Sequence, residues 1–179
     1  MSKRYVTFMA GVGILAVIFG IIYATVQQAQ RSAANYPQIQ MAQDTASKIS
    51  KTDDSHVASL QPPVDMESSL APFTIVYDLK GKVVSGSGYL GKKVPKAPLG
   101  ILKDAKGKDY NAVTWQPRKD VRIAAVTVAA KKYYVLSGRS LTEVEKNENK
   151  TFWLAFAGGV ISIIILAGYF AAKMVVVRR

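Results

Sequence analysis

The chain has 179 residues, no cysteine, one histidine and a formal net charge of +12. The lack of cysteine excludes disulfides, thiolate metal sites and a cysteine nucleophile, and one histidine excludes a metal site built from several histidines of this chain. Hydrophobic residues make up 49% of the sequence and gather at its two ends, which leaves room for one small domain between them.

The first uncharged run covers residues 5–26 and follows Lys3 and Arg4. At a rise of about 1.5 Å per residue, such a run crosses a hydrocarbon core of about 30 Å. It therefore predicts a transmembrane helix, with residues 1–4 in the cytoplasm. A cleaved signal peptide is the alternative, but the run is longer than the usual apolar stretch of about 7–15 residues and no convincing A-x-A site follows.

Residues 27–72 are predicted to form an extracytoplasmic helix and a linker. Residues 27–35 can prolong the membrane helix, and Pro37 suits the first turn of a new helix. Apolar residues then recur at helical spacing, at Ile39, Ala42, Ala46 and Ile49. Residues 50–59 are polar and predict a linker or hinge, with His56 as a solvated loop residue.

A strand-like pattern begins at Phe73 and defines a predicted sheet domain over residues 73–138. Runs rich in β-branched and aromatic residues predict five strands, at residues 73–77, 82–85, 109–116, 121–130 and 133–137. Pro117 is expected to end the third strand. Residues 90–103 predict a loop with at most one helical turn, because they contain two glycines and two prolines. The predicted fold class is α+β, with an antiparallel sheet and flanking helices.

The segment from Ser140 to Glu143 matches the capping box S-x-x-E and predicts the start of a helix. No breaker follows, so residues 139–150 are expected to continue into a second transmembrane helix at residues 151–172. Residues 173–179 form a basic tail. Since short basic flanks stay in the cytoplasm, both termini are predicted inside a bacterial cell membrane and the central domain outside.

Small residues recur every four positions in both predicted membrane helices. The two ladders consist of Ala16, Gly20 and Ala24 in the first helix, and Gly158 and Ser162 in the second. Such ladders let helices approach closely and favour packing of the two helices or self-association. The alternative is that small residues are simply common in membrane helices.

Basic residues outnumber acidic ones in the predicted sheet domain. Lys92, Lys93 and Lys96 cluster in its long loop and predict contact with anionic headgroups or an anionic surface polymer. The alternative is a solvated surface whose lysines protect sheet edges. No nucleic-acid-binding motif is present, so a specific nucleic-acid partner is not expected.

Strand alternation places Arg122 on the same face as Ala124, Val126 and Val128. An arginine on such a face can hold a carboxylate, and Tyr77 and Trp115 could wall a ligand site beside it. The alternatives are that Arg122 pairs with Asp120 or Asp78, or lies on an exposed face of the sheet.

Five segments, at residues 32–40, 69–78, 113–117, 121–124 and 136–145, are similar to parts of a known family. They resemble the extracytoplasmic PAS- or Cache-like sensor regions of bacterial two-component histidine kinases. The resemblance implies a sensor domain between two membrane helices. It departs from the family after the second uncharged run, where seven residues follow in place of a kinase. Any signal is therefore expected to pass to a separate membrane protein.

No catalytic arrangement, metal site or cofactor motif is found. A Ser-His-Asp triad would need His56, and neither a Walker A motif nor H-E-x-x-H is present. The sequence predicts a non-enzymatic, membrane-anchored sensor-like protein that binds a ligand or partner. The alternative is a structural or accessory subunit of a larger membrane complex.

Overall fold

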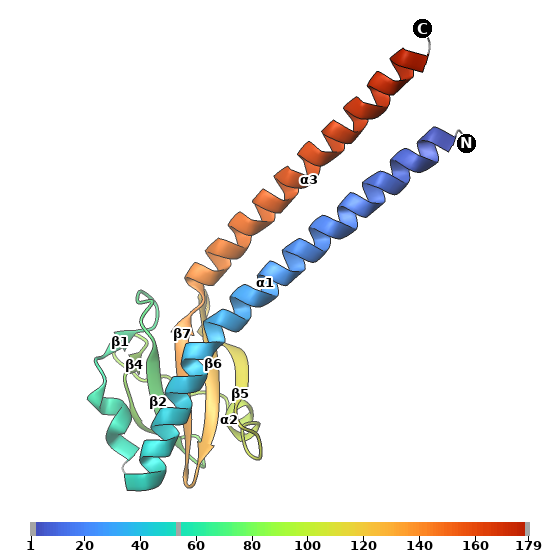
Figure 1. The fold of residues 1–179 in the computed structure, drawn as a ribbon. Coiled ribbons are helices and arrows are strands. Elements are labelled where there is room, and N and C mark those ends of the chain that lie inside the picture. Colours follow the sequence, from blue (N-terminus) through green and yellow to red (C-terminus); the bar gives the residue numbers. More distant parts are fainter. Residues whose placement is uncertain (1–2, 53–54, 178–179) are drawn as a thin grey trace. The chain divides into compact units, whose positions relative to one another are not determined.

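The computed structural model describes residues 3–52 and 55–177 and divides into two compact units. The helical unit comprises Met1–Gln30 and Lys146–Arg179, and the sheet unit comprises Arg31–Glu145. Helices α1 (Lys3–Thr52) and α3 (Thr142–Val177) each contribute residues to both units (Figure 1). Arg178 and Arg179 of the predicted basic tail lie outside the described residues.

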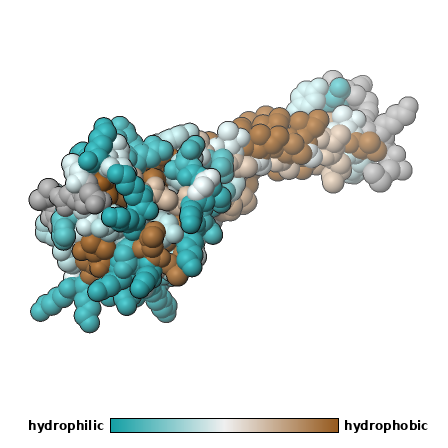
Figure 2. All heavy atoms as spheres, turned by 90° about the horizontal axis from the view of Figure 1, so that it is seen from below, coloured by the Kyte–Doolittle hydropathy of each residue, from teal (hydrophilic) through white to brown (hydrophobic). Residues whose placement is uncertain are grey.

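Both α1 and α3 are long and apolar enough to cross a membrane. Their apolar windows are not buried by other parts of the protein, and Figure 2 shows the hydrophobic surface along the helices. An unburied apolar surface of this length is unfavourable in water and favourable in hydrocarbon. The helices therefore have the properties of a two-pass membrane protein.

Five antiparallel strands form the main sheet, which confirms the predicted α+β class. They are β2 (Phe73–Asp78), β3 (Val83–Gly86), β5 (Asn111–Arg118), β6 (Val121–Ala130) and β7 (Tyr133–Ser140), in the order β3-β2-β7-β6-β5. Counted along the chain, this order is second, first, fifth, fourth and third. The predicted strands match these closely, although β7 continues three residues beyond residue 137.

Short elements complete the sheet unit. They are the 3₁₀ helix η1 (Ser55–Leu60), the parallel pair β1 (Val64–Asp65) and β4 (Gly88–Tyr89), and the helix α2 (Leu99–Lys103). The single turn of α2 agrees with the loop predicted over residues 90–103. The parallel pair was not predicted, because a strand of two residues has no periodicity to recognise.

The sheet has a hydrophobic core on each face. On one face, Phe73, Tyr77 and Trp115 pack with Leu102 of α2. On the other face, the second half of α1 packs against the strands through Ala42, Ala46 and Ile49, with Ile39 partly buried beside them. These are the four residues whose helical spacing predicted an amphipathic helix.

Pro37 does not begin a new helix, as was expected, but lies inside α1. Proline inside a helix removes one hydrogen bond and costs about 3 kcal/mol. Burial of Ile49, and of Ile39 in part, against the sheet offsets this cost, since a large apolar side chain contributes about 1.5–3 kcal/mol when fully buried. Tertiary packing thus outweighs the local signal.

The predicted linker at residues 50–59 is also corrected. Helix α1 continues to Thr52, and η1 then packs on the sheet with Ser55 and Ala58 buried. The Ser85 hydroxyl donates a hydrogen bond to the Ser55 carbonyl. His56 is exposed within η1 instead of in a loop. The packing of this segment could not be predicted from its polar composition, because its contacts use backbone atoms and small side chains.

Pro117 does not end β5, which continues to Arg118. The pairing with β6 is irregular between Trp115 and Arg118, and β5 is an edge strand. Proline is tolerated at such a place, because its missing N–H falls where the ladder is already interrupted.

Candidate functional site: the junction of the sheet with α3

The most distinctive polar site of the sheet unit lies where β7 passes into α3. Ser140 is the last residue of β7 and pairs with Ile123 of β6. Only Leu141 separates it from α3, and the Leu141 N–H donates a 2.9 Å hydrogen bond to the Arg122 carbonyl. The Leu141 side chain is buried. The start of α3 is therefore attached directly to the central strands.

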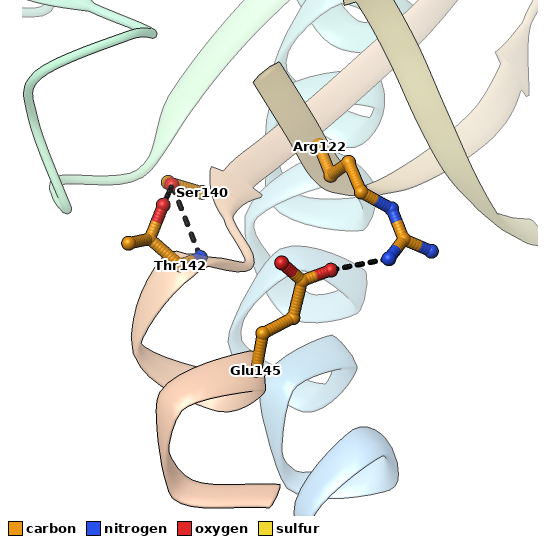
Figure 3. A network of polar contacts seen from close by, with 4 residues as sticks. All are labelled: Arg122, Ser140, Thr142 and Glu145. Atoms are coloured by element: carbon orange, nitrogen blue, oxygen red, sulfur yellow. Dashed lines mark hydrogen bonds and ion pairs between the residues drawn. The ribbon is translucent and has the colours of Figure 1, made fainter. Parts of the chain in front are cut away.

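Ser140 organises the first turn of α3. Its hydroxyl lies 2.9 Å from the Thr142 hydroxyl and accepts a 3.3 Å hydrogen bond from the Thr142 N–H (Figure 3). The predicted helix start is correct. The capping box itself is different, since the Ser140 hydroxyl accepts from Thr142 and not from Glu143.

Arg122 reaches from β6 to α3. Its guanidinium lies 2.5 Å from the Glu145 carboxylate, and both side chains are about half exposed (Figure 3). An ion pair at this exposure contributes at most about 1 kcal/mol. Glu143 and Glu145 also lie in the first turn of α3, where negative charge is favoured by the helix dipole. The pair thus adds little stability and connects β6 to the first turn of α3.

The predicted ligand residues do not converge. Tyr77 and Trp115 are buried in the core on one face of the sheet, whereas Arg122 is exposed and bound to Glu145. Val121 and Ile123, which flank Arg122 in β6, belong to the core that contains Tyr77 and Trp115. Alternation along the strand therefore directs Arg122 to the opposite face. Arg122 is exposed on the sheet, as one alternative predicted, but its ion-pair partner is Glu145 in place of the predicted Asp120 or Asp78.

Tyr77 has a structural environment. Its hydroxyl donates a 2.9 Å hydrogen bond to the Pro95 carbonyl and so fixes the loop that crosses the sheet. Burial raises the pKa of the Tyr77 phenol well above its ordinary value, and a backbone hydrogen bond from Ala97 opposes this only in part. The phenol is therefore a neutral donor near physiological pH.

Two further arginines are bound at the same end of the sheet as Arg122. Arg118 forms an ion pair with Glu67, and the Arg139 side chain donates a 2.8 Å hydrogen bond to the Leu70 carbonyl. Both contacts hold the segment after β1. In that segment the Asp65 carboxylate accepts hydrogen bonds from the Glu67 N–H and the Ser68 hydroxyl, which lower the pKa of Asp65.

The predicted anionic-contact lysines Lys92, Lys93 and Lys96 are all exposed. They lie in the loop that covers the β2–β3 side of the sheet. That loop is anchored by a hydrogen bond from the Leu90 N–H to the Lys93 carbonyl and by Val94, which packs beside Gly86. The lysines therefore point outward from an ordered loop.

The two small-residue ladders of the helical unit behave differently. A Cβ added at Gly158 would lie 2.9 Å from a ring carbon of Phe19, so Gly158 lets α1 and α3 approach closely. Ser162 donates its hydroxyl to the Gly158 carbonyl. In contrast, Ala16, Gly20 and Ala24 are exposed. Gly158 of the α3 ladder thus lies against α1, whereas the α1 ladder lies on an exposed face, where self-association stays a prediction.

A groove of about 280 Å³ lies between the two helices and borders Gly20. Its walls are almost entirely apolar, with an aromatic cluster from Tyr23, Phe152 and Phe156 at one side. Gly20 is the residue of the α1 ladder that lines this groove, together with apolar residues of both helices.

Sequence reasoning did not find Leu141 or Glu145 as parts of the junction. Glu145 lies 23 residues from Arg122, and no local spacing relates the two. The predicted helix start could have indicated Glu145, because it placed this residue in the first turn of a helix, next to the end of a strand.

Among residues 3–52 and 55–177, no group of three His, Cys, Asp or Glu side chains is arranged to hold a metal ion. Comparison of the chain with family models, curated proteins and solved structures finds no match.

Proposed function

We propose that the protein is a non-enzymatic, two-pass membrane protein with a PAS- or Cache-like sensor domain. In this proposal both termini are cytoplasmic, the sheet unit lies outside a bacterial cell membrane, and no cofactor is needed. The domain responds to a ligand or partner and signals through a separate membrane protein. The five-stranded antiparallel sheet and the two apolar helices support this assignment.

The attachment of α3 to the central strands carries the proposal. A change in the sheet that moves Arg122 would act directly on Leu141 and Glu145, because both are bound to Arg122. The weakness of the exposed ion pair suits a switch, since a small difference in free energy is enough to populate two arrangements. The response would not need a pocket formed by Tyr77, Trp115 and Arg122.

The alternative function is that of a structural or accessory subunit in a larger membrane complex. The exposed ladder of Ala16, Gly20 and Ala24, with the groove beside Gly20, favours it. Small residues on an unpaired face allow a further transmembrane helix, from another protein or a second copy, to pack closely.

Photocrosslinking in cells tests both functions. A photoreactive amino acid at Gly20, which is exposed, captures neighbours in the membrane. The reversals Arg122→Glu and Glu145→Arg are then introduced singly and together. A sensor requires that each single reversal change the amount or pattern of the captured partner, and that the double reversal restore it.

A captured partner that does not respond to either reversal would support the accessory subunit and contradict signalling through the junction. Thermal unfolding provides the control for these variants. Because the pair contributes at most about 1 kcal/mol, the single reversals should remain folded.

A further inference from the structure

The arginines of the main sheet gather at one end, which also carries the exposed Lys119. At the end where α3 begins, Arg118, Arg122 and Arg139 are each bound to an acceptor within the sheet unit. The opposite end, which we call the distal end, contains the turn after β2, the loop around α2 and the β6–β7 turn. Its cations are lysines, and most of them are exposed.

Pairing of the strands shows that these segments share one end. Asp78, the last residue of β2, pairs with Tyr133, the first residue of β7. The β5 strand begins opposite Thr127, near the end of β6, and the Asn111 side chain donates a 2.9 Å hydrogen bond to the Ile101 carbonyl of α2. The eight residues of β7 separate this end from the start of α3 by about 26 Å.

The turn after β2 is held rigidly against α2. The Asp78 carboxylate accepts hydrogen bonds from the Lys80 and Lys82 N–H groups, both at 2.8 Å. Gly81 has a φ of 79°, and a Cβ added to it would lie 3.2 Å from a methyl group of Leu99. The turn therefore presents its side chains in a fixed arrangement beside α2.

Apolar side chains are exposed at this same end. Leu79 is 51% exposed, Leu99 is 36% exposed and Tyr110 is 40% exposed. The same segments carry exposed lysines, at positions Lys80, Lys82, Lys96, Lys103, Lys106 and Lys108. Three aspartates lie in the same segments, and one of them, Asp78, caps the turn.

We propose that the distal end docks on the surface of an anionic lipid bilayer. The lysines bind headgroup phosphates, while Leu79 and Leu99 enter the interface beside them. Lysines near an anionic membrane surface each contribute appreciably to binding, and interfacial apolar side chains add to this. The exposed leucines favour a bilayer over a soluble polyanion, because a soluble polymer offers them no apolar environment. The inference uses the sheet unit alone and does not depend on signalling.

Vesicle flotation with the full chain tests the proposal. The protein is placed in nanodiscs of neutral phosphatidylcholine and mixed with vesicles of equal parts phosphatidylcholine and phosphatidylglycerol, or of phosphatidylcholine alone. We expect binding to the anionic vesicles only. Binding should weaken steeply at about 1 M salt, where the screening length falls to about 3 Å.

Paired substitutions locate the surface. Replacing Lys80 and Lys82 by Gln should weaken binding to anionic vesicles by about 30-fold. Replacing Lys92 and Lys93 by Gln removes the same charge from exposed positions outside the distal end and should change binding less than about 3-fold. The proposal would be overturned if both double substitutions weakened binding to anionic vesicles equally. It would also be overturned if the variant without Lys80 and Lys82 bound these vesicles as strongly as the wild type.

Leucine substitutions distinguish the bilayer from a polymer. Leu79→Ser combined with Leu99→Ser should reduce binding to anionic vesicles and leave any binding to soluble polyphosphate unchanged. Binding to polyphosphate without binding to anionic vesicles would overturn the proposal in favour of a polymer partner. Far-UV circular dichroism confirms that each variant remains folded.

Discussion

At the scale of single residues, close packing around Phe73 determines which residues two neighbouring strand positions can hold. Positions for a Cβ at Gly138 and Gly88 lie 2.7 Å and 2.4 Å from the Phe73 ring. The ring therefore occupies space that a side chain at either position would need. Glycine is required at these two strand positions by the approach of the ring.

Gly138→Ala is accordingly expected to destabilise the sheet unit by about 1–3 kcal/mol, because the new methyl group overlaps both Phe73 and Ile123. Chemical denaturation followed by circular dichroism measures the change. Gly100→Ala is the control, since no other segment of the protein comes within 4 Å of its added Cβ, and it should not destabilise the sheet unit. Equal effects of the two substitutions would contradict this packing.

Tyr77 predicts a dependence of stability on alkaline pH. Because burial raises the pKa of its phenol, the contribution of the neutral form is complete below the ordinary pKa of 10 and is lost as pH rises through the folded-state value. Tyr77→Phe should cost about 1 kcal/mol at neutral pH through the lost bond to Pro95. It should then lose less stability than the wild type between about pH 8 and about pH 11. Urea unfolding at both pH values measures this, and parallel losses would show that Tyr77 is not responsible.

At the scale of elements, the sequence predicts regular strands and helix starts better than contacts between distant segments. The strand at Val121–Ala130 and the helix start after Ser140 follow from alternation and from a short capping signal. The continuation of α1 through Pro37, the packed 3₁₀ helix after Thr52 and the partner of Arg122 do not follow, because each depends on a surface supplied by a remote segment. For the same reason, the sequence could not show that Arg122 lies on the opposite face of the sheet from Tyr77 and Trp115, with which it was predicted to form a ligand site.

The pairing of α1 with α3 in the helical unit has a defined register. Phe8 contacts Phe170 and Tyr23 contacts Phe152, with ring centroids 5.6 Å and 5.8 Å apart, and Gln30 donates a hydrogen bond to Thr151. Positions advance along one helix as they recede along the other, so the helices pair antiparallel.

Introduced cysteines test this register without interference, because the chain has no native cysteine. Gly11→Cys with Leu166→Cys should form an intramolecular disulfide on oxidation, since a Cβ at position 11 lies 3.0 Å from the Leu166 side chain. Gly13→Cys with Leu166→Cys is the control, because nothing lies within 4 Å of position 13. Gel mobility reports the disulfide, and equal yields for both pairs would exclude the register.

At the scale of the whole molecule, the protein consists of two apolar helices and one sheet unit, and the sheet passes into α3 after Ser140. The helices have the length and composition to cross a membrane, and the sheet unit has its own two-sided core. Both proposed functions, signalling and subunit assembly, assume the same arrangement, in which the sheet unit lies outside the membrane and the ends of the chain lie inside.

Labelling of single cysteines in intact cells with a membrane-impermeant maleimide tests this arrangement most directly. Lys119→Cys, in an exposed turn of the sheet unit, should react in intact cells. Lys173→Cys, at the far end of the second apolar run, should react only after the membrane is permeabilised. Reaction of Lys173→Cys in intact cells, or protection of Lys119→Cys until permeabilisation, would contradict the account.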